Sequence, residues 1–140
     1  MRRFEIQIDI KAQKEKVWEA LVDFESYPNW NPTLTYVEGH LKSGEILHAR
    51  FGRARNLTAA DVEQVEEGNM FVMSRSLIHP YLVHMAHDFE LQEIEGGVTQ
   101  FIQRWHCKGM LVPFLWSKMT TGMLKFERFN RGLKSYIEGH

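Results

Sequence analysis

Apolar and polar residues alternate at the start of the chain and then change to a helical spacing. Residues 4–10 alternate with a period of two, which predicts a β-strand with one buried face. From residue 12 to residue 22 apolar side chains recur at helical spacing, so a helix follows. Asp23 can cap a second short helical turn. Pro28 and Pro32 should end that turn, because a proline biases the preceding residue toward extended geometry.

Six more strands are predicted in the middle of the chain, where short apolar runs alternate with glycine-containing and polar turns. They cover Leu34–Leu41, Ile46–Phe51, Thr58–Val65, Met70–Arg75, Val83–Glu93 and Val98–Cys107. Their short connections favour antiparallel pairing between neighbours.

One long helix is predicted at the C-terminal end. Pro113 is a favoured first residue, and an apolar stripe continues from there to Ile137 before Gly139 ends the helix. Pro113 to Glu138 is roughly 26 residues, or about 39 Å of helix. The stripe must be buried against the sheet, so we predict an α+β fold in which a strongly curved antiparallel sheet grips the helix. Because such a wrap rarely fills completely, we also expect a cavity between helix and sheet.

Composition and charge narrow the class of protein. The 140 residues form one expected domain, 1–140, with 44% hydrophobic and 25% charged residues, as in a globular protein. A net charge of −1 argues weakly against nucleic acid as a partner. The N-terminus lacks the pattern of a signal peptide, and no apolar run is long enough for stable membrane insertion. We therefore expect a cytoplasmic protein.

Short motifs along nearly the whole chain resemble one known superfamily. Residues 12–21 read A-x-x-E-x-V-W-x-x-L, and residues 23–32 read D-x-x-x-Y-P-x-W-N-P. Further matching segments are HDFEL at 87–91, GVT at 97–99, GMLVP at 109–113, and Phe129-Asn130 ahead of Leu133-Lys134. In their order and spacing they resemble the SRPBCC superfamily, which has the START-like helix-grip fold, and within it the polyketide cyclase/dehydrase-like branch.

The resemblance implies a seven-stranded antiparallel sheet around the C-terminal helix, with two short helices after the first strand. It also implies a pocket for lipids, sterols, polyketides or other hydrophobic molecules, but no single activity. The chain departs from the family pattern at Gln13, where proline is frequent. It departs again at His106 and Cys107, where acidic and aromatic residues are common.

Two predicted strands should place polar side chains on the inner wall. The apolar face of residues 83–93 includes His87, and that of residues 98–107 includes Gln103. Both faces point inward if the connecting loop is the three residues 95–97, in which glycine tolerates a positive φ. His87 then lies opposite Trp105 and diagonal to Gln103.

The candidate ligand-binding residues combine these strand positions with the helix and one turn. They are Trp30, Phe51, Met73, Met85, His87, Phe89, Gln103, Trp105, Met119 and Met123. The methionines could adapt to irregular ligands or simply fill the core. Trp30 could form the cavity rim or pack under the junction between the short helices and the second strand.

No catalytic residue is assigned, and His87 is the candidate. It is a hydrogen-bonded core residue, a group that orients a ligand, or an acid/base catalyst. Asp88 and Glu90 alternate outward, so no paired acid and base is visible. Histidine spacing does not suit a metal site, no cofactor is expected, and Cys107 fits a buried hydrophobe better than a nucleophile.

A basic cluster, Arg50, Arg53 and Arg55, lies beside a predicted loop. It is either a solvated edge or a contact for an acidic head group or carrier protein.

Three functions remain open. The leading hypothesis is a carrier or sensor that binds a small hydrophobic molecule of lipid, polyketide or aromatic type in the cavity. The alternatives are a cyclase or dehydratase that uses His87 as acid/base, and a module that binds a protein partner.

Overall fold

The computed structural model describes residues 1–139 and has the predicted α+β architecture. Its elements are β1 (Arg2–Ile10), α1 (Lys14–Val22), η1 (Phe24–Ser26), α2 (Tyr27–Trp30), β2 (Leu34–Glu38), β3 (Ile46–Phe51), β4 (Thr58–Glu66), β5 (Met70–Leu77), β6 (Val83–Ile94), β7 (Val98–Lys108), α3 (Val112–Leu124) and α4 (Phe126–Glu138). Within this range, seven strands form one antiparallel sheet in the order β1-β7-β6-β5-β4-β3-β2. No helix in the described chain is both long and apolar enough to cross a membrane.

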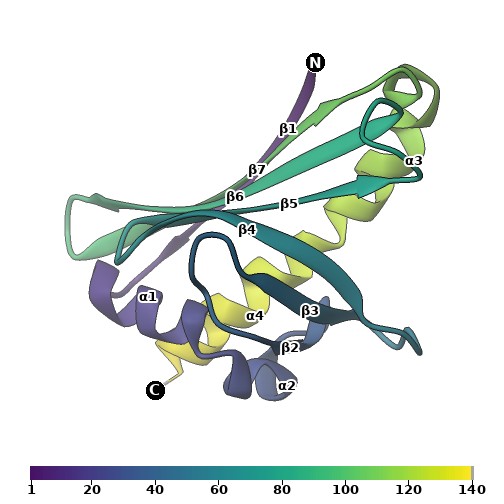
Figure 1. The fold of residues 1–140 in the computed structure, drawn as a ribbon. Coiled ribbons are helices and arrows are strands. Elements are labelled where there is room, and N and C mark those ends of the chain that lie inside the picture. Colours follow the sequence, from purple (N-terminus) through teal and green to yellow (C-terminus); the bar gives the residue numbers. More distant parts are fainter. Residues whose placement is uncertain (140) are drawn as a thin grey trace.

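The sheet curls around the C-terminal helices, as predicted. Figure 1 shows α3 and α4 running diagonally across one face of the sheet, with α1 and α2 beside α4 at one end. The helices bury an apolar stripe that includes Phe129 and Leu133, both fully buried. The helix-grip prediction is therefore confirmed.

The predicted register between β6 and β7 is confirmed. His87 pairs with Trp105, and the last pair before the turn is Ile94 with Val98. Residues 95–97 form the loop, where Gly96 and Gly97 have φ values of 81° and 72°. Residues that carry a side chain rarely adopt such backbone angles, so the two glycines permit the tight turn that sets this register.

The long C-terminal helix is confirmed over residues 112–138, with one local interruption. Lys125 separates α3 from α4, and its N–H bonds to the carbonyl of Gly122 at 3.2 Å, three residues back. This is the tighter spacing of a 3₁₀ turn. The apolar stripe continues across it, which explains why the sequence pattern predicted one unbroken helix.

The segment YPNWNP forms α2 and the turn into β2. The prediction that Pro28 ends a helical turn was wrong. Tyr27 is helical (φ −53°, ψ −42°), and Pro28 lies in the first turn of α2. Proline is tolerated there, since its missing N–H would have no partner inside the helix. Asn31 then turns the chain, since its Oδ1 accepts hydrogen bonds from the N–H groups of Thr33 (3.0 Å) and Leu34 (2.8 Å).

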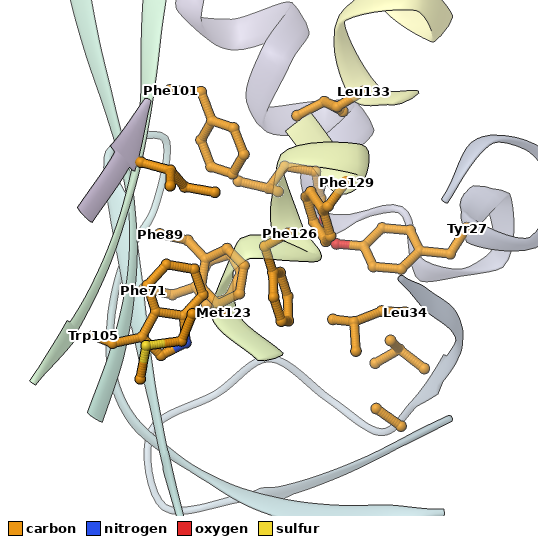
Figure 2. Close-up of a cluster of buried hydrophobic side chains, with 14 of the residues drawn as sticks. Tyr27, Leu34, Phe71, Phe89, Phe101, Trp105, Met123, Phe126, Phe129 and Leu133 are labelled. Carbon is orange, nitrogen blue, oxygen red and sulfur yellow. The ribbon is translucent and has the colours of Figure 1, made fainter. Parts of the chain in front are cut away.

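An aromatic core joins this junction to the sheet. Figure 2 shows Phe126 and Phe129 of α4 between Tyr27 on one side and strand residues on the other. The α4 helix approaches α2 closely at Gly132, where a Cβ atom would lie 2.2 Å from the carbonyl oxygen of Trp30. Glycine is therefore required at this contact.

Candidate functional site

A cavity of ≈ 1020 Å³ lies between the concave face of the sheet and the C-terminal helices. Strands β2 to β7 supply its walls on one side, and residues 115–128 of α3 and α4 supply the other. Its apolar lining is formed by Leu34, Phe51, Met73, Leu77, Met85, Phe89, Trp105, Leu115, Met119, Met123 and Phe126. This size is at the upper end of the range for small-molecule sites.

Most of the predicted site residues come together around this cavity. Eight of the ten line it, namely Phe51, Met73, Met85, His87, Phe89, Trp105, Met119 and Met123. Gln103 is completely buried and does not line the cavity, but it forms a hydrogen bond with His87, which does. Trp30 is placed elsewhere.

Trp30 belongs to the helix junction and does not line the cavity. Its ring packs edge-on against Phe129 and Tyr27, with centroid distances of 5.3 and 4.8 Å. Its Nε1–H donates a hydrogen bond to Ser26 Oγ at 3.0 Å. These contacts pair its N–H group and pack its ring against the core. Of the two positions considered for Trp30, the rim of the cavity was therefore wrong, and the side chain packs at the junction between the short helices and the second strand.

His87 lies among three aromatic side chains in the cavity wall. Its ring is stacked on Phe89 and Trp105 at centroid distances of 4.0 and 4.2 Å, and Phe126 meets it edge-on at 5.0 Å. These rings hold the imidazole in one plane, so its nitrogens have fixed directions.

A hydrogen-bond chain determines which nitrogen of His87 carries the proton. Gln103 Nε2 donates to Asn130 Oδ1 on α4 at 2.6 Å, which leaves Gln103 Oε1 facing His87 Nε2 at 2.7 Å. Because Oε1 can only accept, Nε2 of the neutral imidazole carries the hydrogen and Nδ1 is the acceptor.

The free acceptor of His87 has access to the cavity. Within residues 1–139, Asn31 Nδ2 is the one fully buried side-chain nitrogen or oxygen without a partner. Nδ1 of His87 forms no hydrogen bond within these residues, yet it is not among the fully buried atoms without a partner, so part of its surface is accessible. Because His87 lines the cavity, that accessible surface faces the cavity. A bound molecule could donate a hydrogen bond there.

Burial keeps His87 neutral. It lowers the pKa of the imidazole to about 3, against the raising effect of the Gln103 hydrogen bond, and the positive charge of Arg75 lowers it further. The ring is therefore an uncharged acceptor at neutral pH and a weak base.

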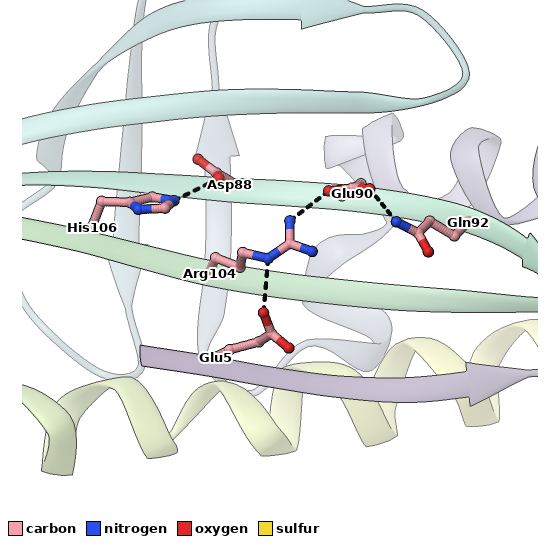
Figure 3. A network of polar contacts seen from close by, with 6 residues as sticks. All are labelled: Glu5, Asp88, Glu90, Gln92, Arg104 and His106. Atoms are coloured by element: carbon pink, nitrogen blue, oxygen red, sulfur yellow. Dashed lines mark hydrogen bonds and ion pairs between the residues drawn. The ribbon is translucent and has the colours of Figure 1, made fainter. Parts of the chain in front are cut away.

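Asp88 and Glu90 of β6 lie on the other face of the sheet, as predicted. Figure 3 shows Asp88 paired with His106 at 2.9 Å, and Arg104 bridging Glu90 and Glu5 at 2.5 and 2.8 Å. Among residues 1–139, no acidic side chain lines the cavity.

Cys107 is completely buried in the wall of the core. Burial raises the pKa of its thiol to about 11, so the group stays protonated at neutral pH. This agrees with a small buried hydrophobe rather than a nucleophile.

Residues 1–138 match the model of a family described as "Polyketide cyclase / dehydrase and lipid transport". The chain belongs to this family. The match covers the cavity walls and both C-terminal helices. No curated protein matches the chain in sequence.

Several solved structures have the same fold as this protein, although their sequence identity to it is low. A protein of Mesorhizobium loti superposes with a TM-score of 0.75 at 17% identity, covering 98% of this chain and 97% of its own. An aromatase/cyclase from a Streptomyces species superposes with a TM-score of 0.73 at 14% identity, and the match covers 98% of this chain and 93% of the other. A START superfamily protein from Mycobacterium smegmatis superposes with a TM-score of 0.71 at 16% identity, and the match covers 98% of this chain and 97% of the other.

Several charged residues of the cavity lining were not among the site residues predicted from the sequence. Basic side chains from both walls line it: Arg53, Arg75, Lys118, Lys125 and Arg128. Arg75 could have been found, because it shares the period-two face of β5 with Phe71 and Met73. Of the predicted arginine cluster, Arg53 reaches the cavity, whereas Arg50 packs over the ring of Tyr36 at 5.6 Å.

Proposed function

We propose that the protein binds a small hydrophobic molecule in the cavity, as a carrier or sensor. The observation that supports this best is the cavity itself, ≈ 1020 Å³ with walls built from aromatic side chains and methionines. Aromatic rings offer rigid apolar surface, and thioether side chains adapt to irregular shapes. Membership of a family described by both cyclase/dehydrase and lipid-transport activities is consistent with such a ligand.

His87 would orient the ligand through a single hydrogen bond. Its Nε2–H is already committed to Gln103, and its stacked ring cannot turn without losing that bond. A hydroxyl or amide N–H on the ligand would donate to Nδ1. This hydrogen bond would give the ligand a defined orientation against the apolar part of the cavity wall.

A cyclase or dehydratase that uses His87 as acid/base is less well supported. A general base works best when its pKa is near the operating pH, and the pKa of His87 is about 3. Asp88 and Glu90, the carboxylates next to His87 along β6, lie on the opposite face of the sheet and pair with His106 and Arg104. Binding therefore fits the environment of His87 better than proton abstraction does.

Filling the cavity should weaken binding without unfolding the protein. N-phenyl-1-naphthylamine, a neutral apolar dye, should bind with a Kd of about 1 μM or tighter, measured by its fluorescence increase. Met119 lines the cavity and is only partly buried, so Met119→Trp can fill space beside the sheet. We expect this variant to bind the dye about tenfold more weakly.

The matched control is Met110→Trp, since Met110 is 74% exposed and outside the cavity lining. It should keep the wild-type Kd, and circular dichroism should show both variants folded. Equal dye affinity in folded Met119→Trp and wild-type protein would place the dye outside the cavity. Absence of dye binding to the wild type would contradict the proposed function itself.

A further inference from the structure

The polar part of the cavity lining is strongly cationic. Five of its residues carry a positive charge: Arg53, Arg75, Lys118, Lys125 and Arg128. Among residues 1–139, none of these five forms an ion pair with a carboxylate, whereas Arg104, His106 and Lys134 do. The protein as a whole has a net charge of −1, so this positive lining is a local feature.

Arg75 differs from the other four because it is half-buried, whereas they are exposed. It lies on the inner face of β5, opposite Met85 of β6. Its guanidinium carbon is 5.5 Å from the ring centroid of Phe51, which is another cavity residue. This cation–π contact directs the guanidinium along the cavity wall rather than outward to solvent.

Holding Arg75 at this position without a counter-ion has a free-energy cost. Burial lowers the pKa of its guanidinium, because desolvation disfavours the charged form. No carboxylate lies within ion-pairing distance of it among residues 1–139. An anion entering the cavity would supply the missing partner, and arginine presents a planar fork that fits carboxylate and phosphate groups.

We propose that the ligand is an anionic amphiphile whose carboxylate or phosphate head group pairs with Arg75 while its apolar body lies against the methionines and aromatic rings. This inference rests on the proposed function and adds the charge of the ligand to it. Lys118 and Arg53, which are exposed cavity residues, would attract the head group during entry. Arg75 would determine specificity.

Matched ligands that differ only in the head group test the proposal. Tridecanoate, dodecyl phosphate and dodecanol share one dodecyl chain, and each can be titrated as a competitor of bound N-phenyl-1-naphthylamine. In the wild type, at least one of the two anions should bind about 10- to 100-fold more tightly than the alcohol, since hydrogen bonds to charged groups are strong. The comparison of the two anions identifies which head group Arg75 prefers.

The variant Arg75→Met keeps a long apolar stem and removes the charge. It should bind dodecanol and the neutral dye with nearly wild-type affinity and lose the preference for the anions. Arg50→Met is the control, because it removes the same charge from β3 while Arg50 packs over Tyr36 and does not line the cavity. The control should keep the full preference.

Each outcome bears on a different claim. If the wild type binds the dye but binds dodecanol and both anions with equal affinity, the ligand is not anionic, while the proposed function still stands. A preference for the anions that survives in folded Arg75→Met, or is lost equally in Arg50→Met, would overturn the role of Arg75. If Arg75→Met does not fold, the wild-type comparison of the three ligands still decides the charge of the ligand.

Discussion

Phe129→Ala should lower the free energy of unfolding by about 3–5 kcal/mol, the range for truncating a large aromatic side chain in a packed core. Phe129 is fully buried on α4. Figure 2 shows its position at the centre of the aromatic core. Its ring contacts five others, those of Tyr27, Trp30, Phe89, Phe101 and Phe126, at centroid distances between 5.3 and 6.0 Å. The substitution therefore weakens the attachment of α4 to α2 and to the sheet together.

Urea denaturation followed by circular dichroism measures this change. Small domains are stabilised by about 5–15 kcal/mol in total, so the loss should move the midpoint far toward zero denaturant. Phe114→Ala is the control, since Phe114 is 83% exposed and should change stability by no more than about 0.5 kcal/mol. A loss below about 1 kcal/mol for Phe129→Ala would mean that α4 is not anchored through this ring.

The second large effect is a loss of stability in acid caused by His87. Its pKa is about 3 in the folded protein and 6.5 in an unfolded chain. Between these values the unfolded state binds a proton that the folded state does not, so stability falls as the pH falls. The slope should be about 1.4 kcal/mol per pH unit for this one group, and above pH 7 the contribution is absent.

His87→Gln isolates this slope, because glutamine does not titrate and its amide can still donate to Gln103 Oε1. Urea unfolding between pH 8 and pH 4 should show a shallower acid-side decline for the variant than for the wild type. Glu90 has a pKa that partial burial raises but that its hydrogen bonds with Arg104 and Gln92 lower overall, and the hydrogen bond from the Lys11 N–H lowers the pKa of Glu138. Both groups contribute to the decline equally in the two proteins. Parallel curves would contradict a neutral, desolvated His87.

The positions of strand residues were predictable because period-two alternation and a short glycine loop act locally. The pairing of His87 with Trp105 and the proximity of Gln103 follow from the loop at residues 95–97, and both are present in the structure. The same rule extends to Arg75, which shares a face with Met73. It was missed because an arginine near the end of a strand is ordinarily a solvated residue.

Other features depend on contacts between distant segments and could not be predicted from local pattern. A tryptophan at position 30 suits the core and a cavity rim equally well, so its position could not be predicted from residue type. It is fixed by contacts with the rings of Phe129 and Tyr136 on α4, about 100 residues away in the chain. The turn at Lys125 is likewise invisible, because the apolar stripe continues across it. Asn130 stands beside Phe129 in the chain, yet its role depends on the approach of α4 to Gln103.

The methionines provide the most direct test of ligand binding in the cavity. Four of the seven line it, Met73, Met85, Met119 and Met123, and the other three, Met1, Met70 and Met110, do not. In protein labelled with ¹³C at the methionine methyl groups, titration with N-phenyl-1-naphthylamine should shift the four cavity signals and leave the other three unchanged. Shifts confined to Met1, Met70 or Met110, with the four cavity methyls unaffected, would contradict ligand binding between the sheet and the C-terminal helices.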